Sequence, residues 1–197
     1  MTLLAFITSL TFRLLLATVV LASFAIYGSL NRPDDAAAVL ATRLDNRIPF
    51  WPVFSVPYLL YFPLLLFVVV YGIAASSSFA KIALTFLSVQ LIAALLYHRH
   101  QTHVPRPPMF RSRDLFHRLT AVIYRHDQPY CTFPSLHVAY SILCGYWLAV
   151  LFPALLPLIV ILVLAIMAST LFLKQHVIAD VCAGTALAGL CLMIAIR

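Results

Sequence analysis

The sequence predicts an all-α, polytopic membrane protein, and its composition and its apolar runs lead to this prediction. Hydrophobic residues make up 63% of the 197 residues, charged residues make up 10%, and the mean hydropathy is +1.01. A soluble domain is about half apolar and about a quarter charged. Because each helical crossing of a bilayer needs about 20 residues, roughly six crossings account for most of the chain. We therefore expect a six-transmembrane helix bundle that forms one domain, residues 1–197.

Six apolar runs are candidate spans. They cover about residues 14–30, 53–74, 79–97, 138–152, 154–172 and 177–196. The wider apolar stretch that contains the first run, Leu3 to Leu30, has no basic residue before it, is interrupted by Arg13 and is longer than the apolar core of a signal peptide, so we interpret it as a span that begins near Arg13. The last run is rich in small residues such as Ala183 and Gly184, which permit close helix packing. We expect this last span at the centre of the bundle.

The segments between the runs have their own signals. Alanine and leucine in residues 36–44 predict a short interfacial helix after the first span. Two prolines around Trp51 predict a non-helical stretch at headgroup depth. Residues 99–133 predict a long polar loop.

Polar and charged residues concentrate in these segments. All six acidic residues and ten of the thirteen basic ones lie between the apolar runs or at their ends. With six spans, the ends of the odd-numbered spans and the starts of the even-numbered spans meet on one face. That face collects three clusters, in residues 99–107, 134–137 and 169–180. The sequence therefore predicts an active site on one side of a membrane.

The first cluster contains two arginines seven residues apart, Arg99 and Arg106, and prolines on both sides hold Arg106 in extended backbone. A guanidinium group matches the geometry of phosphate oxygens, and two such groups can neutralise a dianion. Loop arginines beside a membrane also contact lipid headgroups. The pair is therefore informative only together with the other clusters.

The second cluster reads Pro134, Ser135, Leu136 and His137. A proline at a helix start leaves the next backbone N–H groups unpaired, and the helix dipole favours an anion there. Ser135 can cap the helix and donate its hydroxyl to a phosphate oxygen, and His137 is placed to protonate a leaving group. The alternative is an ordinary helix cap with an interfacial histidine.

The third cluster runs from Ser169 to Asp180. His176 and Asp180 are four residues apart, so one helical turn brings the carboxylate to the imidazole. A carboxylate in a membrane is costly unless it has a partner. A hydrogen bond to one ring nitrogen fixes the tautomer and leaves the other nitrogen as a nucleophile. The alternative is a structural pair that holds the helix end.

Together the three clusters resemble the type-2 phosphatidic acid phosphatase superfamily. Its signature is Lys, six residues, Arg-Pro; then Pro-Ser-Gly-His; then Ser-Arg, five residues, His, three residues, Asp. The matching residues are Arg99 and Arg106, then Ser135 and His137, then Ser169, His176 and Asp180. The resemblance extends over about residues 45–185. Residues 45–51 and the leucine in the second motif are similar to the branch that contains inositol-phosphorylceramide synthases and their bacterial relatives.

Three positions depart from the signature. Arg99 replaces the lysine and keeps its charge, Leu136 replaces the glycine, and Thr170 replaces the arginine of the third motif. The last change leaves the phosphate site one cation short. Lys174, two residues before His176, is the candidate substitute.

The resemblance implies a two-step phosphoryl transfer. His176 attacks phosphorus, Asp180 stabilises the phosphohistidine, and His137 protonates the leaving group. The phosphate-binding residues would be Arg99, Arg106, Ser135, Lys174 and Ser169. Positioning and electrostatic stabilisation then supply the catalysis, with no cofactor and no metal ion required.

The same resemblance implies a lipid phosphate or a polyprenyl diphosphate as substrate, with membrane lipid around the protein and no nucleic-acid partner. Water is the expected acceptor because the chain is short, which makes the enzyme a hydrolase; the alternative is a phosphotransferase. Residues 109–127, with four arginines, are expected to bind the headgroup or anionic lipid. The sequence leaves the oligomeric state open.

Orientation is a conflict between two rules. The positive-inside rule places the arginine-rich face in the cytoplasm, whereas the site of relatives usually faces outward. We expect a bacterial inner-membrane protein whose site faces the periplasm or exterior.

Two further classes compete with the enzyme. Histidines 98, 100 and 103 suggest a zinc or haem site, but the arginines beside them disfavour a divalent metal. A non-catalytic membrane binding or transport protein would leave the co-occurrence of His137, His176 and Asp180 unexplained.

Overall fold

A computed structural model describes residues 9–75, 78–108 and 114–196, and the regular elements of those residues are all helices, without any β-strand. The α-helices are α2 (Leu10–Leu30), α3 (Ser55–Ala75), α4 (Phe79–Arg99), α5 (Leu115–His126), α6 (Leu136–Leu151), α7 (Leu156–Phe172) and α8 (Ile178–Ile196). Three short 3₁₀ turns are η1 (Asp45–Arg47), η2 (Pro52–Phe54) and η3 (Pro153–Leu155). The all-α class predicted from composition is confirmed for this part of the chain.

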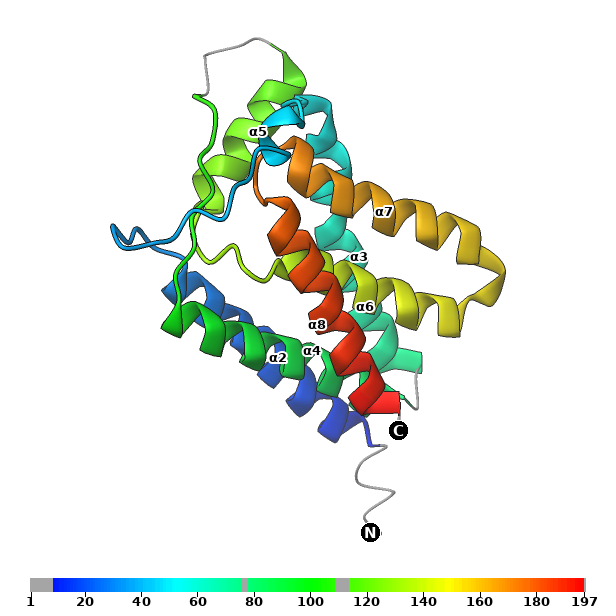
Figure 1. Cartoon of the computed structure of the whole chain (residues 1–197). Coiled ribbons are helices and arrows are strands. Elements are labelled where there is room, and N and C mark those ends of the chain that lie inside the picture. The colour runs from blue at the N-terminus through cyan, green and yellow to red at the C-terminus, as the bar shows by residue number, and fades with distance from the viewer. Residues whose placement is uncertain (1–8, 76–77, 109–113, 197) are drawn as a thin grey trace.

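Five segments in the described residues are long and apolar enough to cross a bilayer: Leu10–Leu30, Pro52–Ala74, Phe79–Arg99, Pro153–Phe172 and Ile178–Ala195. These segments confirm a multi-pass membrane protein. α6 is apolar but has only 16 residues, so the count of six spans stays a prediction. α2 begins and α8 ends at the same end of the molecule, as an even number of crossings requires (Figure 1).

α6 occupies the centre of the bundle, where we expected the last span. Nearly all its residues from Leu136 to Leu148 are buried, and it packs against α3, α4, α7 and α8. α8 crosses α6 and also contacts α4, but it exposes Met193 and Ile194 (Figure 1). α2 lies along α4 at the outside. The small residues of α8 thus allow a close contact with α6, but they do not mean that α8 is buried on all sides.

The interfacial helix expected in residues 36–44 is not confirmed, because this segment is non-helical. It runs beside the segment that follows α4 instead. The Ala38 N–H donates to the Gln101 carbonyl at 2.9 Å, and the His103 N–H donates to the Ala38 carbonyl at 2.9 Å. These long-range hydrogen bonds satisfy backbone groups that a helix would have paired locally.

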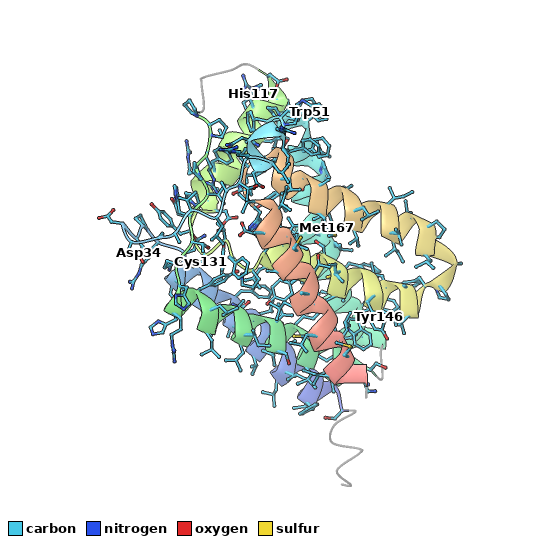
Figure 2. The ribbon with its side chains drawn as sticks, viewed as in Figure 1. Asp34, Trp51, His117, Cys131, Tyr146 and Met167 are labelled. Carbon is cyan, nitrogen blue, oxygen red and sulfur yellow. The ribbon has the colours of Figure 1, made fainter. Side chains whose placement is uncertain are left out.

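The polar segment before α6 contains a helix, α5, where we expected a loop. The Asp114 side chain caps it by accepting from the His117 N–H at 3.0 Å. Thr120 and Ile123 are buried, while Arg118 and Arg125 are exposed. α5 lies over η2 and the start of α3, and Trp51 and His117 mark this end of the molecule in Figure 2. The expected headgroup-binding arginines of residues 109–113 lie outside the described residues.

Candidate active site

The imidazole of His176 faces the carboxylate of Asp180, as the spacing predicts. Nδ1 of His176 lies 3.3 Å from Oδ2 of Asp180, and both side chains are buried. His176 precedes the helix, and α8 begins at Ile178. The same Oδ2 accepts from the Val177 N–H at 3.0 Å, so one carboxylate both holds the helix start and faces the imidazole. With a hydrogen on Nδ1, Nε2 keeps its lone pair.

The start of α6 is fastened to the start of α8. The Ser135 N–H donates to the Asp180 carbonyl at 3.1 Å. Gly184, one helical turn after Asp180, has no side chain to hold α6 away: a Cβ there would lie 2.5 Å from the Ser135 carbonyl oxygen. The second and third sequence motifs therefore meet at the contact between α6 and α8.

His137 is brought beside His176 by this contact. The centroids of the two imidazole rings are 5.8 Å apart. On its other sides, the His137 ring packs between Tyr58 and Tyr61 of α3, with centroid distances of 4.6 Å and 4.7 Å. Two histidines far apart in the sequence thus lie close enough to reach one bound phosphate.

The two serines of the motifs are fully buried, and both are engaged within their own helices. The Ser135 side chain caps α6 by accepting from the Val138 N–H at 3.3 Å. The Ser169 hydroxyl donates to the Ile166 carbonyl at 2.6 Å within α7. The first interaction matches the capping role that the sequence predicts for Ser135, while a phosphate contact of either serine stays a prediction.

Arg106 lies at the site and is held by two residues that the sequence analysis did not select. Its guanidinium donates to the side-chain oxygen of Gln175 and, at 3.3 Å, to the carbonyl of Tyr124. The guanidinium carbon also lies 4.4 Å from the centroid of the Tyr124 ring. Burial lowers the pKa of Arg106, although nearby Asp127 opposes this change. α5, which supplies Tyr124, therefore positions the second arginine of the first motif.

Two buried donors at this place have no hydrogen-bond partner among the described residues. They are Nε of Arg106 and Nε2 of Gln175. Buried donors are costly to leave unpaired, and a phosphate offers several acceptor oxygens. Gln175 could have been found from sequence as the polar neighbour of His176 inside the third motif.

Arg99 is placed differently from Arg106. It lies in the exposed last turn of α4, whereas Arg106 is partly buried. The structure thus brings one arginine of the first motif to the site and leaves the other at the surface.

Lys174 lines the same cavity as His176 and binds the backbone of the segment before α3. Its ammonium donates to the carbonyls of Asp45, at 2.9 Å, and Ile48, at 2.5 Å. Burial lowers the pKa of Lys174, and the charge of Asp45 raises it in part. An ammonium has three hydrogens, so one remains for another acceptor. The phosphate contact suggested by the sequence stays a prediction.

Asp45 caps the start of α8 from a distant part of the chain. Its Oδ1 accepts from the Ile178 N–H at 2.7 Å, while its Oδ2 accepts from the backbone and hydroxyl of Thr42. Burial raises the pKa of Asp45, but the hydrogen bonds from Thr42 and Ile178 bring it below its ordinary value. The sequence marks Asp45 as an acidic residue at the start of the segment 45–51, which resembles one branch of the family. It does not indicate that Asp45 binds the start of α8.

The cavity beside His176 has a volume of about 160 Å³. Its polar lining consists of Asp45, Asn46, Lys174 and His176, with prolines 105 and 107 on either side of Arg106. An oriented imidazole and an ammonium line this cavity, and the buried donors of Arg106 and Gln175 belong to residues that are next to its lining residues in the chain. This set can hold a small anion and attack its central atom.

The part of the chain that the structure describes contains no set of side chains that could hold a metal ion. No three side chains of His, Cys, Asp or Glu gather there closely enough to hold an ion. Of the histidines that suggested zinc or haem, the ring of His103 packs at a tilt against Tyr130, with ring centroids 5.1 Å apart, and His98 is exposed on α4.

Comparison with known proteins gives one match. A family model described as the PAP2 superfamily matches residues 2–194, which is nearly the whole chain. No curated protein and no solved structure shows a significant match.

Proposed function

Because the chain belongs to the PAP2 superfamily, we propose that it is a membrane-embedded lipid phosphatase that acts through a phosphohistidine at His176. Family membership suggests a phosphatase-type lipid enzyme, and the helices long and apolar enough to cross a bilayer support a substrate that lies in the membrane. The observation that carries the proposal is the buried His176–Asp180 pair with His137 beside it. The proposed substrate is a lipid phosphate or a polyprenyl diphosphate.

In the first step, Nε2 of His176 attacks phosphorus, and the bond from phosphorus to the leaving oxygen breaks; this bond is an ester when an alcohol leaves and an anhydride when a phosphate leaves. His137 gives its proton to the departing oxygen, and Asp180 stabilises the positive charge on the substituted imidazole. In the second step, water attacks phosphorus, its proton passes to His137, and the bond between nitrogen and phosphorus breaks. Inorganic phosphate and the free histidine result.

The phosphate oxygens are proposed to bind cations and donors around the small cavity. Arg106 is the principal ligand because it is partly buried and its Nε has no partner among the described residues. Lys174 replaces the missing arginine of the third motif through its remaining hydrogen. Arg99 would bind from the rim, and Ser135 and Ser169 would contribute their hydroxyls. Donors fixed before the reaction stabilise the developing charge without reorganisation.

We place the protein in a bacterial inner membrane with the site facing the periplasm or exterior. The excess of arginine on that face has a catalytic explanation, and acidic residues partly offset it. The positive-inside rule predicts the opposite orientation, with the site in the cytoplasm. In this proposal the arginines lie on the site's face because they take part in catalysis, so they do not report the orientation.

The proposed function is tested by phosphate release from the purified protein in detergent with EDTA present. The substrates are phosphatidic acid, phosphatidylglycerol phosphate and undecaprenyl diphosphate, and the variant is His176→Ala, with His98→Ala as an exposed histidine control. Release by the wild type and by His98→Ala, together with loss in His176→Ala, is expected. A ³²P-labelled, acid-labile protein adduct should appear only when His176 is present. Full activity of a folded His176→Ala variant would overturn the proposal.

A further inference from the structure

His137 differs from His176 in how its imidazole is held. Nδ1 of His176 lies 3.3 Å from the carboxylate of Asp180. Within the described residues no hydrogen bond reaches a ring nitrogen of His137, and its ring packs instead against those of Tyr58 and Tyr61. The proposed mechanism requires a proton on His137 at the start of the first step. A positive charge must therefore be stabilised at a buried position.

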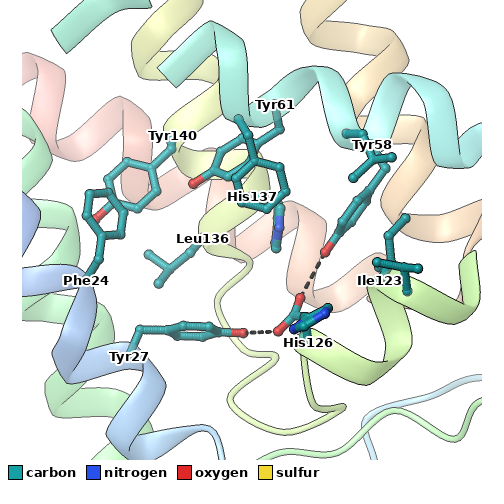
Figure 3. Close-up of a pocket in the computed structure, with 13 residues that line it drawn as sticks. Phe24, Tyr27, Tyr58, Tyr61, Ile123, His126, Leu136, His137 and Tyr140 are labelled. Carbon is teal, nitrogen blue, oxygen red and sulfur yellow. Dashed lines mark hydrogen bonds between the residues drawn. The ribbon is translucent and has the colours of Figure 1, made fainter. Parts of the chain in front are cut away.

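His137 also lines a cavity of about 390 Å³ between α2, α3, α5 and α6. The lining is mostly aromatic and aliphatic, and Asp127, directly after α5, is the carboxylate among the described lining residues. Figure 3 shows the His137 ring in the cavity wall, with Tyr27 and Tyr58 around the same space. A carboxylate and the imidazole thus share one apolar space, where charges are screened less than in water.

Asp127 is held by neutral donors from α2 and α3. Its Oδ1 accepts from the Tyr27 hydroxyl at 2.7 Å and from the Asn31 amide at 2.9 Å. Its Oδ2 accepts from the Tyr58 hydroxyl at 2.9 Å (Figure 3). Asp127 forms no ion pair with any residue that the structure describes. These hydrogen bonds stabilise an ionised carboxylate, but they leave its negative charge without a cation in contact.

Tyr58 connects this carboxylate to His137. Its hydroxyl binds Asp127, while the centroid of its ring lies 4.6 Å from that of the His137 ring. Tyr61 packs on His137 at 4.7 Å, but in the described part of the chain its hydroxyl makes no hydrogen bond to Asp127. Because Tyr58 is buried and held at both its ring and its hydroxyl, it ties the position of Asp127 to that of the imidazole.

Several other titratable groups surround His137. They are Tyr58 and Tyr61 of α3, Tyr140 of α6, His126 of α5, Arg106, and His176 with its partner Asp180. The charges of Arg106 and of a protonated His176 repel a proton on His137, whereas the charge of Asp127 attracts it. Asp180 already faces His176. Among these groups, Asp127 is therefore the carboxylate that can stabilise a protonated His137.

We propose that Asp127 is a positioning residue of the reaction: with Tyr58 it orients the imidazole of His137, and its charge stabilises the proton that His137 gives to the leaving oxygen. The inference rests on the proposed function, because it concerns the acid of that reaction. The proton passes from His137 to the departing oxygen in the first step and returns from water in the second, and Asp127 stays ionised throughout. α2, which carries none of the three motifs, contributes through Tyr27 and Asn31.

The protonation of His137 is measured first, without substrate. Protein labelled with ¹⁵N-histidine is titrated in detergent by NMR from about pH 3 to about pH 8, and the His137 signal is assigned by its loss in His137→Gln. Asp127→Asn should move the midpoint of the His137 titration to lower pH by about one unit or more, because a nearby carboxylate favours the protonated ring. Tyr61→Phe is the matched control, since it keeps a ring against His137 and leaves Asp127 in place. An unchanged midpoint in Asp127→Asn, or a wild-type ring that takes up no proton in this range, would overturn the proposal.

Turnover is then followed against pH with the substrate, among the three named above, that the wild type hydrolyses fastest. Asp127→Asn should lower kcat about tenfold or more and move the basic limb of the kcat profile to lower pH, while KM stays within about twofold. Tyr58→Phe keeps the ring and should lower kcat at least about threefold, while Tyr61→Phe stays within about twofold of wild type. A rise in KM with unchanged kcat would show that Asp127 acts through Arg106, and would overturn its role at His137.

The outcomes separate this inference from the proposed function. A shifted His137 midpoint in a protein that forms no phosphohistidine would contradict the proposed function and retain the link between Asp127 and His137. A phosphohistidine in the wild type, together with a kcat profile that Asp127→Asn leaves unchanged, would retain the proposed function and overturn the role of Asp127. If Asp127→Asn does not fold, Tyr58→Phe decides: a kcat equal to that of Tyr61→Phe would overturn the proposal.

Discussion

Gly184 of α8 lies directly against the backbone of Ser135 at the start of α6, and a Cβ at position 184 would lie 2.5 Å from the Ser135 carbonyl oxygen. The glycine therefore sets how closely α6, which carries His137, can approach α8, which begins just after His176. A backbone atom, unlike the end of a flexible side chain, cannot move aside on its own.

We predict that Gly184→Ala separates α6 from α8 and lowers activity. Overpacking of this kind costs about 1–3 kcal/mol of stability, and the displaced His137 should lower kcat by about tenfold or more. Gly189→Ala is the matched control, because a Cβ at that position meets nothing within 4 Å. Thermal unfolding in detergent and phosphate release check both variants. Equal activity of Gly184→Ala and Gly189→Ala would contradict the role of this contact.

Asp45 should make the stability of the protein depend on acid pH. Its pKa in the folded state lies below the ordinary value of 3.8 because of hydrogen bonds from Thr42 and Ile178, which outweigh the effect of burial. The ionised carboxylate therefore stabilises the fold above about pH 4, and this contribution is lost as pH falls through the folded pKa. Asp45→Asn should lower the melting temperature at pH 6, and the difference from wild type should shrink below about pH 4. A difference that stays constant across this range would argue against Asp45 as the source.

Gln175 and Arg106 should act together on the phosphate. Gln175→Ala removes one hydrogen bond to the guanidinium, and we expect a loss of about 10-fold in kcat/KM, the effect of about 1.5 kcal/mol. Gln175→Glu keeps a hydrogen-bond acceptor but adds a negative charge beside the phosphate. It should therefore be the more damaging change, with a loss of about 100-fold. The measurement is steady-state phosphate release at several ionic strengths; a Gln175→Glu variant more active than Gln175→Ala would refute the placement of phosphate here.

The two arginines of the first motif should differ in importance. Arg106 is partly buried and held by Gln175 and Tyr124, whereas Arg99 is exposed. Arg106→Ala should reduce kcat/KM by about 100-fold or more, since it removes a partly desolvated charge. Arg99→Ala should reduce it by about tenfold or less, because an exposed charge is screened. The reverse order would show that substrate draws Arg99 inward.

Membrane orientation can be read from two single cysteines. In a Cys182→Ala background, Asp35→Cys reports the face of the candidate site. Ser77→Cys, between α3 and α4 in the sequence and outside the described residues, is chosen to report the opposite face. With intact cells, an impermeant maleimide should label the cysteine at position 35 and spare the one at position 77. The opposite labelling pattern would place the site in the cytoplasm.

The sequence by itself determined the class of the protein and the residues of its motifs. Composition and long apolar runs depend only on which residues are present, and they were enough to predict an all-helical membrane protein. The contact between His176 and Asp180 was also predictable, because four residues of separation bring two side chains together locally.

Only the tertiary structure decided which distant segments meet. Residues 36–44 were expected to be helical, but their backbone pairs with the segment after α4. The alanines and glycines of α8 suggested a central helix, whereas burial shows that α6 is central and that one glycine provides the close contact. We did not predict α5, although residues 115–126 form an amphipathic helix with one apolar and one polar face.

The same limit applies to the site. The roles of Asp45 as a cap for α8 and of Gln175 as a partner of Arg106, and the position of His137 beside His176, depend on contacts across large sequence separations. Local propensity and spacing act within a few residues, so they select side chains with suitable chemistry. The packing of the helices then decides which of those side chains face one another, because burial and hydrogen bonding are satisfied over the whole bundle at once.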